Sequence, residues 1–231
     1  SLPALVRGRP VPVQTRLAVG ITVALLAVAF VAVAVLEWTR TLGGLSFADR
    51  LHNAWFQAVT PRTAGFNSVD IAAIKPATYV LMLLLMFIGG CPGSTAGGVK
   101  TTTFGLLLLT MLASLRGQQQ ATFRGRQIAH ASIYRAGAIV TLGAFTVILG
   151  VFALLLTQDL TMRKAVFEVV SAFGTVGLSV GATAELDGVG KVVVMVIMFL
   201  GRVGPLSLFL LLSDEDRRPL WKYPEEEVAV G

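Results

Sequence analysis

The apolar residues of the chain are gathered into long, uninterrupted runs. Residues 17–36 and 137–156 contain no charged side chain. A helix needs about 20 apolar residues to cross the roughly 30 Å hydrocarbon core of a bilayer. Residues 79–115 are also long enough to cross, but a glycine-rich stretch interrupts them, and residues 192–212 carry Arg202 in their middle. The pattern therefore predicts four helical crossings, one of them broken.

Two further apolar segments are too short to cross. Residues 53–70 read NAWFQAVTPRTAGFNSVD, and residues 164–183 read KAVFEVVSAFGTVGLSVGAT. Each pattern predicts an apolar helix of about ten residues followed by a glycine-containing extended stretch. Such a segment can dip into a membrane and return where protein or a water-filled cavity covers its backbone.

These short segments belong to an internal repeat with an offset of 112 residues. With one residue of slip in the helices, the matched pairs are Thr63 and Thr175, Gly65 and Gly177, Phe66 and Leu178, Ala54 and Ala165, and Phe56 and Phe167. Both copies have two crossings and face the same way, so the axis that relates them runs along the membrane normal. The sequence therefore predicts an all-α membrane protein of two tandem span–pore-loop–span repeats, with a pore on that axis.

The glycine turns after the short helices are predicted to line this pore as a filter. Backbone carbonyl oxygens can replace the hydration shell of a cation, and glycine allows the close approach and positive φ that such a turn needs. The carbonyl ends of the short helices would add a favourable partial charge. The filter residues are Thr63, Ala64, Gly65 and Phe66 with Thr175, Val176, Gly177 and Leu178, and the cation is assigned to the carbonyls of Thr63, Ala64, Gly65, Thr175, Val176 and Gly177.

The sequence GGCPGSTAGGVKTTT at 89–103 breaks the second crossing. Gly90 follows Gly65 by 25 residues, and Arg202 follows Gly177 by 25, so the break and the charge share one level below the filter. An intramembrane charge is a functional-site hypothesis by default, and broken backbone is tolerated there only against protein or a wet cavity. We predict a mobile gate in which Arg202 binds loop carbonyls or limits cation passage by its charge. Its residues are Gly89, Gly90, Pro92, Gly93, Ser94, Thr95, Gly97, Gly98, Lys100 and Arg202.

The glycine-rich loop and the glycine turns have other interpretations. A phosphate-binding loop reads GxxxxGK[ST], and here Val99 separates Gly98 from Lys100, so the pattern fails by one residue. A passive helix kink stays open as an alternative, although one proline would suffice for it. Ordinary extracellular turns are the alternative to the two filter turns.

Composition supports a membrane protein. Of the 231 residues, 55% are hydrophobic and 14% are charged, against about 25% charged in an average soluble domain. The net charge of +6 does not indicate nucleic acid, because the basic residues cluster just outside the apolar spans. Two segments carry arginines without any acidic residue, which predicts cytoplasmic termini and a cytoplasmic central linker. These arginines are Arg7, Arg9, Arg16, Arg116, Arg124, Arg126 and Arg135.

The predicted organisation has five parts. They are a cytoplasmic segment (1–16), a first repeat with the broken span (17–115), a cytoplasmic linker (116–136), a second repeat ending in the span with Arg202 (137–213) and a cytoplasmic tail (214–231).

Several of these stretches together resemble a known family. The motifs TPRTAGFNSVD, GGCPGSTAGGVKTTTF, SAFGTVGLSVGAT, GRVGPLSLFLL and YPEEEVAVG are similar to those of the Trk/Ktr/HKT superfamily of potassium transporters, above all its Ktr membrane (translocating) subunits. The resemblance implies a four-repeat pore of which this chain matches the third and fourth repeats, with a first half expected upstream. It also implies filter glycines at Gly65 and Gly177, a gating loop at 89–100 and a cavity arginine at Arg202.

The resemblance extends to location and partners. It implies a homodimer among the lipids of the bacterial inner membrane, bound to a cytosolic ring of nucleotide-binding regulatory subunits. Potassium is the expected transported ion and Na⁺ the expected stimulating ion, and we expect no cofactor in this chain and no nucleic-acid partner.

We therefore predict potassium uptake by a channel-like transporter that performs no enzymatic reaction. Potassium would lose its water to the filter carbonyls and pass under control of the glycine-rich loop. The alternative is a secondary transporter with broken helices that couples a cation to another solute. An alternating-access carrier would saturate at low rates, whereas a pore would not.

Overall fold

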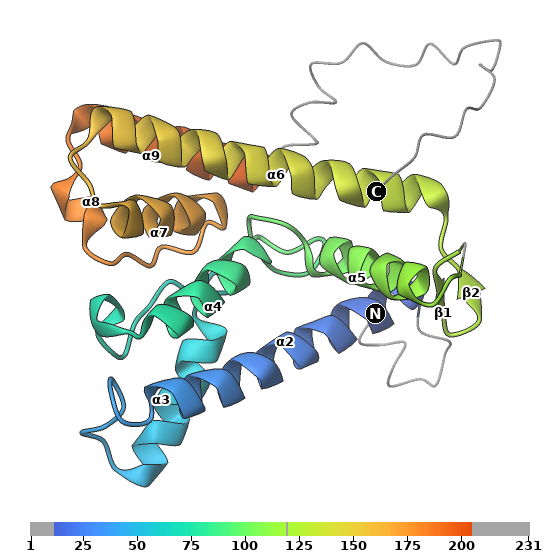
Figure 1. Ribbon diagram of the computed structural model, residues 1–231, viewed down its shortest axis with the longest axis horizontal. Helices are drawn as coiled ribbons and strands as arrows, with labels where there is room; N and C mark the ends of the chain where they lie inside the picture. The colour runs from blue at the N-terminus through green and yellow to red at the C-terminus, as the bar shows by residue number, and fades with distance from the viewer. Residues whose placement is uncertain (1–11, 119, 205–231) are drawn as a thin grey trace.

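The computed structural model describes residues 12–118 and 120–204, and within them the chain is mainly helical (Figure 1). Residues 1–11 of the first predicted segment, 205–213 of the last predicted span and the predicted tail 214–231 lie outside the described residues. The elements in chain order are α2 (Val13–Glu37), α3 (Phe47–Val59), η1 (Ile71–Ala73), α4 (Pro76–Phe87), α5 (Thr101–Leu115), β1 (Thr122–Phe123), β2 (Arg126–Gln127), α6 (His130–Thr157), α7 (Met162–Phe173), α8 (Ala182–Glu185) and α9 (Gly188–Val203).

Two helices of the described residues, α2 and α6, are long and apolar enough to cross a membrane by length and composition. Large apolar side chains stay exposed along both, such as Val28 and Val35 on α2 and Phe145 and Phe152 on α6. Exposed apolar surface on this scale indicates contact with lipid or another protein. In Figure 1 both helices begin at one end of the molecule and run toward the end that holds α3 and α8.

The interruption predicted in the second apolar span is present. Helices α4 and α5 are separated by residues 88–100, which are not helical. Helix α4 begins with Pro76, a residue that suits the first turn because no backbone donor is lost there. The Glu37 carboxylate at the end of α2 accepts the Lys75 N–H at 2.8 Å and the Thr78 hydroxyl at 2.5 Å. This carboxylate fastens the start of α4 to the end of α2.

The predicted linker 116–136 is not a simple helical connection. Strands β1 and β2 form a two-residue hairpin ladder, and α6 begins at His130, seven residues before the predicted start of its span. The turn residues Arg124 and Gly125 have φ values of 49° and 75°. Positive φ at both central positions is the geometry that two-residue hairpin turns prefer, because it matches the twist of the strands. The all-α description is therefore corrected by one small hairpin.

Helix α9 is shorter than the predicted span of 192–212. It ends at Val203, and Gly204 has a φ of 86°, a left-handed value that often ends a helix. The sequence places Pro205 next, and the residue before a proline disfavours the helical conformation. Arg202 therefore lies in the last turn of α9.

The start of α9 is held by a side-chain cap. The Asp187 carboxylate accepts the backbone N–H of Gly190 at 2.8 Å and the Gln158 amide at 2.7 Å. These hydrogen bonds, the one from Gly190 first, lower the pKa of Asp187. The cap also joins the start of α9 to the end of α6.

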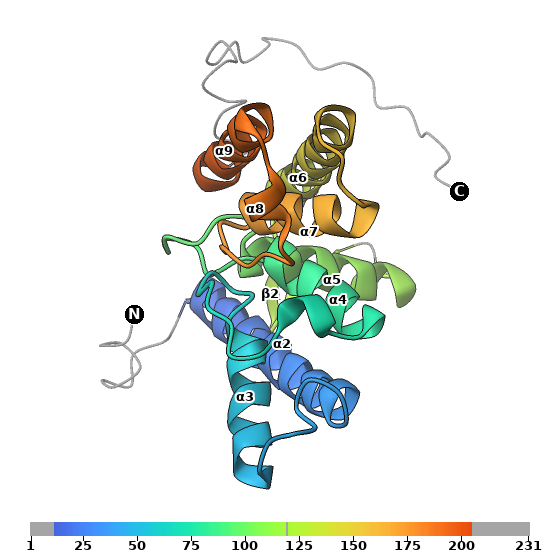
Figure 2. The same cartoon turned by 90° about the vertical axis from the view of Figure 1, so that its left-hand side faces the viewer.

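Short helix α7 lies at the centre of the packing. Eight of its twelve residues are buried, against three of thirteen in α3. Phe173 stacks on Phe87 of α4, and Phe167 lies beside Tyr79 of α4, both with ring centroids 5.5 Å apart. Such aromatic pairs contribute about 0.5–1.5 kcal/mol each beyond their burial. Figure 2 shows α7 between the α6–α9 pair and α4, so the residues after α7 are held against those after α4.

Candidate functional site

Two loops follow the short helices and carry the predicted filter residues. The first loop comprises residues 60–66 after α3, and the second loop comprises residues 174–178 after α7. Positive φ occurs at alternate positions in both loops, and in each pair a threonine precedes a glycine by two residues. The values are 72° at Thr63, 75° at Gly65, 52° at Thr175 and 94° at Gly177. The residues that match in sequence therefore also match in backbone conformation.

The two loops lie against each other at their glycines. A Cβ atom added to Gly65 would lie 2.2 Å from the carbonyl oxygen of Val176, closer than any side chain can be placed. A Cβ on Gly177 would meet the Cα of Gly65 at 3.7 Å, an ordinary contact. Glycine at position 65 is therefore needed for the close approach of the second loop as well as for its own positive φ.

Hydrogen bonds at the helix ends fix the loops and leave carbonyl groups free. The N–H of Val176 donates to Ser171 at 2.9 Å, and the N–H of Ala64 donates to Thr60 at 3.2 Å. The Thr60 hydroxyl donates to the carbonyl of Phe66, so that carbonyl is occupied. Among the described residues, no hydrogen bond reaches the carbonyl oxygens of Thr63, Ala64, Gly65, Thr175, Val176 or Gly177.

Free carbonyls are the groups here that could bind a cation. Residues 12–118 and 120–204 contain no group of three or more His, Cys, Asp or Glu side chains placed to hold a metal ion. Carbonyl oxygens are hard ligands that suit alkali and alkaline-earth cations. The last predicted filter residue of each loop has a different environment. Phe66 is 72% exposed, whereas Leu178 is buried in the core with Met86 and Phe167.

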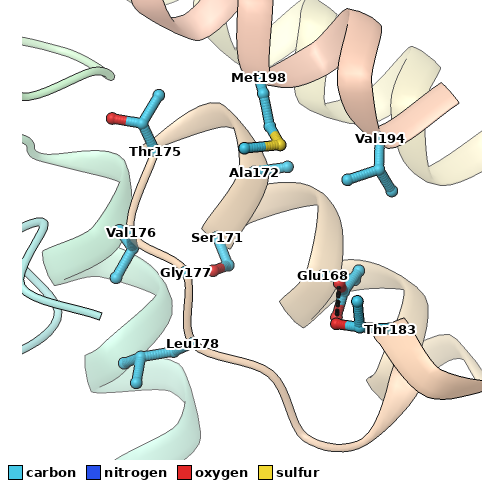
Figure 3. A pocket seen from close by; sticks show the side chains of 10 residues that line it. All are labelled: Glu168, Ser171, Ala172, Thr175, Val176, Gly177, Leu178, Thr183, Val194 and Met198. Atoms are coloured by element: carbon cyan, nitrogen blue, oxygen red, sulfur yellow. Dashed lines mark hydrogen bonds between the residues drawn. The ribbon is translucent and has the colours of Figure 1, made fainter. Parts of the chain in front are cut away.

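A cavity of about 250 Å³ lies behind the second loop. Figure 3 shows Glu168 and Thr183 on one side of it and the residues from Thr175 to Leu178 on the other. The Glu168 carboxylate accepts the Ser179 hydroxyl at 2.7 Å and the Thr183 hydroxyl at 2.5 Å. Glu168 was not among the predicted site residues, although an acidic residue inside the apolar segment 164–183 was a visible signal.

The glycine-rich loop (residues 88–100) is closed at its base by backbone hydrogen bonds. The N–H of Gly89 donates to Val99 at 2.8 Å, and the N–H of Thr101 donates to Gly90 at 3.1 Å. A Cβ atom on Gly89 would lie 1.9 Å from the carbonyl oxygen of Gly97. The two limbs of the loop are therefore packed backbone against backbone, which a larger residue at Gly89 would prevent.

This loop lies directly against the second loop and α9. The N–H of Gly97 donates to the Thr175 hydroxyl at 2.9 Å, and the N–H of Gly98 donates to the carbonyl of Gly201 at 3.3 Å. Residues 93–95, which include Ser94 and Thr95, form its exposed tip. Ser94 bonds the carbonyl of Cys91 across Pro92 and Gly93, with its hydroxyl at 2.6 Å and its N–H at 3.1 Å. Its buried limb therefore touches the filter segment, and its tip does not.

The cations around the glycine-rich loop are arranged differently from the prediction. Lys100 donates to the carbonyl of Ala96, and Arg62 donates to the carbonyl of Gly89 at 3.2 Å. Arg202 is exposed, and within residues 12–118 and 120–204 it makes no side-chain hydrogen bond to the loop. Two carbonyls of the loop on which Arg202 was predicted to act, those of Ala96 and Gly89, accept from Lys100 and Arg62 instead. Arg62 was missed, although TPRTAG places an arginine next to a predicted filter residue.

The model of the TrkH family, described as cation transport protein, matches residues 12–222. The chain belongs to this family. The Ktr system potassium uptake protein B of Bacillus subtilis is 43% identical to it over 220 residues, covering 94% of this chain and 49% of that protein.

Two further comparisons agree with the family. The potassium/sodium uptake protein NtpJ of Enterococcus hirae is 38% identical over 232 residues, covering 97% of this chain and 51% of that protein. The crystal structure of the potassium transporter TrkH from Vibrio parahaemolyticus has the same fold, with a TM-score of 0.71 at 24% identity, over 84% of this chain and 43% of that one. The chain spans about half the length of these relatives.

Proposed function

We propose that this chain contributes half of the pore of a channel-like potassium uptake transporter. The observation that carries the proposal is the pair of touching loops, each with positive φ at a threonine and a glycine two residues apart. Their unoccupied carbonyls offer oxygen ligands to a cation that sheds its water. The names of the relatives, potassium uptake protein B and potassium/sodium uptake protein, favour K⁺ as that cation.

The filter acts in this proposal through the backbone. The carbonyls of Thr63, Ala64 and Gly65 and of Thr175, Val176 and Gly177 bind K⁺, which moves down its electrochemical gradient. Phe66 and Leu178 end the two filter stretches, since the Phe66 carbonyl is already bonded and the Leu178 side chain is buried.

The glycine-rich loop acts as the gate beneath the filter. Its buried limb bonds the second loop through Thr175, and its base bonds Arg62, so a movement of the loop changes the underside of the filter. Gly89, Gly90, Gly97 and Gly98 let its limbs pack closely, and Lys100 holds the carbonyl of Ala96. In this proposal the positive charges of Arg202 and Lys100 oppose the passage of a cation.

Location and partners complete the proposal. The protein is a homodimer in the bacterial inner membrane, with both chain ends and the 116–136 linker in the cytoplasm. The rest of the pore comes from the part of the relatives that this chain does not match. A cytosolic ring of nucleotide-binding subunits regulates the gate, and Na⁺ stimulates transport.

Gly177→Asp tests the filter. A side chain at this positive-φ position, carrying a charge into the carbonyl ring, should raise the K⁺ concentration for half-maximal uptake or abolish uptake. The measurement is K⁺ uptake into liposomes by the chain completed with the other half found in its relatives. Gly44→Asp is the control, because Gly44 is exposed and a Cβ atom added there would meet no atom within 4 Å. Wild-type uptake by Gly177→Asp would remove this loop from the filter.

Deletion of residues 93–97 tests the gate. The deletion removes the exposed tip together with the Gly97 donor to Thr175. Basal K⁺ flux without the regulatory ring should rise. Unchanged, still regulated flux would mean that the loop is a passive kink.

The broken span α4–α5 favours a second candidate, a secondary transporter that couples a cation to another solute. Such a carrier would show saturating, low turnover and a fixed stoichiometry with the second solute. Rates that keep rising with the K⁺ gradient would exclude it.

A further inference from the structure

A long polar side chain is buried in each of the short helices before the candidate filter loops, in addition to the small Ser171 of α7. Gln57 in α3 is 1% exposed, and Glu168 in α7 is 6% exposed. The offset of 111 residues that pairs Ala54 with Ala165 also pairs Gln57 with Glu168. The two side chains therefore occupy equivalent positions in the repeat. A filter made of backbone carbonyls does not explain why a polar side chain is buried at either position.

Each of these side chains bonds a serine eleven residues further along the chain. Gln57 Nε2 donates to Ser68 Oγ at 3.2 Å, and Ser179 Oγ donates to Glu168 Oε2 at 2.7 Å. The hydrogen bond links the short helix to the segment that follows the filter glycine, and so closes a loop of the chain that contains this glycine. The shared separation and partner make this a brace that both loops possess.

The brace of the second loop carries a carboxylate that accepts only. Its two oxygens accept the hydroxyls of Ser179 and Thr183, and Ser179 Oγ in turn accepts the N–H of Gly181 at 3.1 Å. Both carboxyl oxygens of Glu168 therefore have a hydroxyl partner. Within residues 12–118 and 120–204 Glu168 has no ion-pair partner, whereas the exposed Glu185 pairs with Lys164.

A buried carboxylate without a counter-charge is costly unless a cation approaches it. The cavity behind the second loop separates Glu168 from the filter residues Thr175, Val176 and Gly177, and side chains of opposite charge do not line it (Figure 3). A cation held by those filter carbonyls would be the nearby positive charge. Gln57 has no charge, and its Oε1 is buried without a partner among the described residues.

We propose that Gln57 and Glu168 are equivalent positioning residues for the two filter loops, and that the carboxylate of Glu168 strengthens cation binding at the second loop. This inference rests on the function proposed above. It gives the two loops different roles in cation binding. Both loops are held by a buried side chain, but only the side chain at the second loop carries a charge.

The test is the K⁺ dependence of uptake by the completed protein in liposomes. Glu168→Gln keeps the size of the side chain and removes the charge. It should raise KM for K⁺ roughly tenfold, the scale of one charge acting through an effective dielectric of about 20, with little change in maximal rate. Glu185→Gln is the matched control, because it makes the same chemical change at an exposed acid, and its KM should equal that of the wild type.

A charge swap separates electrostatics from shape. Gln57→Glu alone should lower KM, and the double variant Gln57→Glu with Glu168→Gln should bring KM back toward the wild-type value. A purely structural brace would not be rescued by a charge on the other helix. The inference is overturned if Glu168→Gln keeps the wild-type KM or if the double variant is no better than Glu168→Gln.

Three further outcomes are decisive. Should Glu168→Gln fail to fold, Gln57→Glu carries the test by itself, and an unchanged KM in that variant would overturn the proposal. A folded wild-type protein without K⁺ uptake would instead contradict the proposed function. Normal wild-type uptake with variants that do not differ would contradict this inference alone.

Discussion

The two candidate filter loops have the same backbone signature and very different surroundings. The second loop follows a helix with eight of twelve residues buried, and it has a cavity, a buried carboxylate and the glycine-rich loop against it. The first loop follows a helix with three of thirteen residues buried, and its Phe66 is 72% exposed. The two loops thus share their backbone conformation, but the second is packed against more of the described protein than the first.

The difference shows which parts of the site this chain organises by itself. The second loop is fixed by α4, α7, α9 and the glycine-rich loop, all described here. The first loop touches it at Gly65 and reaches the glycine-rich loop through Arg62, while its Ala64 and Phe66 are exposed. We expect substitutions at matched positions of the two loops to have unequal effects.

The largest inequality is expected for alanine at the two filter glycines. Gly65→Ala combines left-handed strain of about 1–2 kcal/mol with forced displacement of about 1–3 kcal/mol, because its Cβ would meet Val176 at 2.2 Å. Gly177→Ala has the strain alone, since its Cβ has room. Thermal unfolding of the purified protein should place Gly65→Ala well below Gly177→Ala, with Gly44→Ala near the wild type. Equal losses would contradict the close contact of the loops.

A smaller inequality is expected for the two filter threonines. Thr175→Val removes the acceptor of the Gly97 N–H, which costs about 1–2 kcal/mol when a buried donor is left unpaired. Basal K⁺ flux should rise roughly tenfold, because about 1.4 kcal/mol is a factor of ten in an equilibrium. Thr63→Val, the matched change in the first loop, removes no hydrogen bond seen among the described residues. If both variants changed flux equally, the gate would not act through the second loop.

Arg163, at the start of α7, joins the region of the second loop to residues 72–74, which follow the first loop. It donates to the carbonyls of Ala72 and Ile74 at 3.3 Å each, and its guanidinium lies 5.2 Å from the Tyr79 ring centroid. Arg163→Met should lower the free energy of unfolding by about 1 kcal/mol, the usual scale for such contacts. The thermal midpoint measures this, and a midpoint equal to that of the wild type would mean that the loop regions hold together without Arg163.

The smallest effect is expected at the exposed ion pair beside it. Lys164 and Glu185 are 32% and 48% exposed, and exposed pairs contribute about 0–1 kcal/mol. Lys164→Met should therefore shift the thermal midpoint little, and less at high salt. A shift larger than that of Arg163→Met would reverse the order proposed here.

Much of the fold could be predicted because apolar runs and glycine positions act locally. The length of 137–156 indicated a helix that can span, and the glycines at 89–98 indicated the break between α4 and α5. The offset between Gly65 and Gly177 found two turns whose φ values agree. Each of these signals depends on residues near one another in the chain.

The errors concern features set by capping and by distant contacts. The early end of α9 depends on Gly204 rather than on the apolar pattern, which continues past it. The partners of the glycine-rich loop are Thr175 and Arg62, which come from two different loops and could not be ranked from spacing alone. Glu168 was visible as an acidic residue in an apolar segment, but its bond to Ser179 depends on how the loop folds back.

Cation flux measured directly tests the central claim that the paired loops form a potassium filter. The completed protein, in liposomes loaded against a K⁺ or a Na⁺ gradient, should carry K⁺ rapidly and in preference to Na⁺. Addition of the regulatory ring should change the rate. A folded protein that carries no K⁺ would contradict the account, since the free carbonyls of the two loops would then serve another ligand.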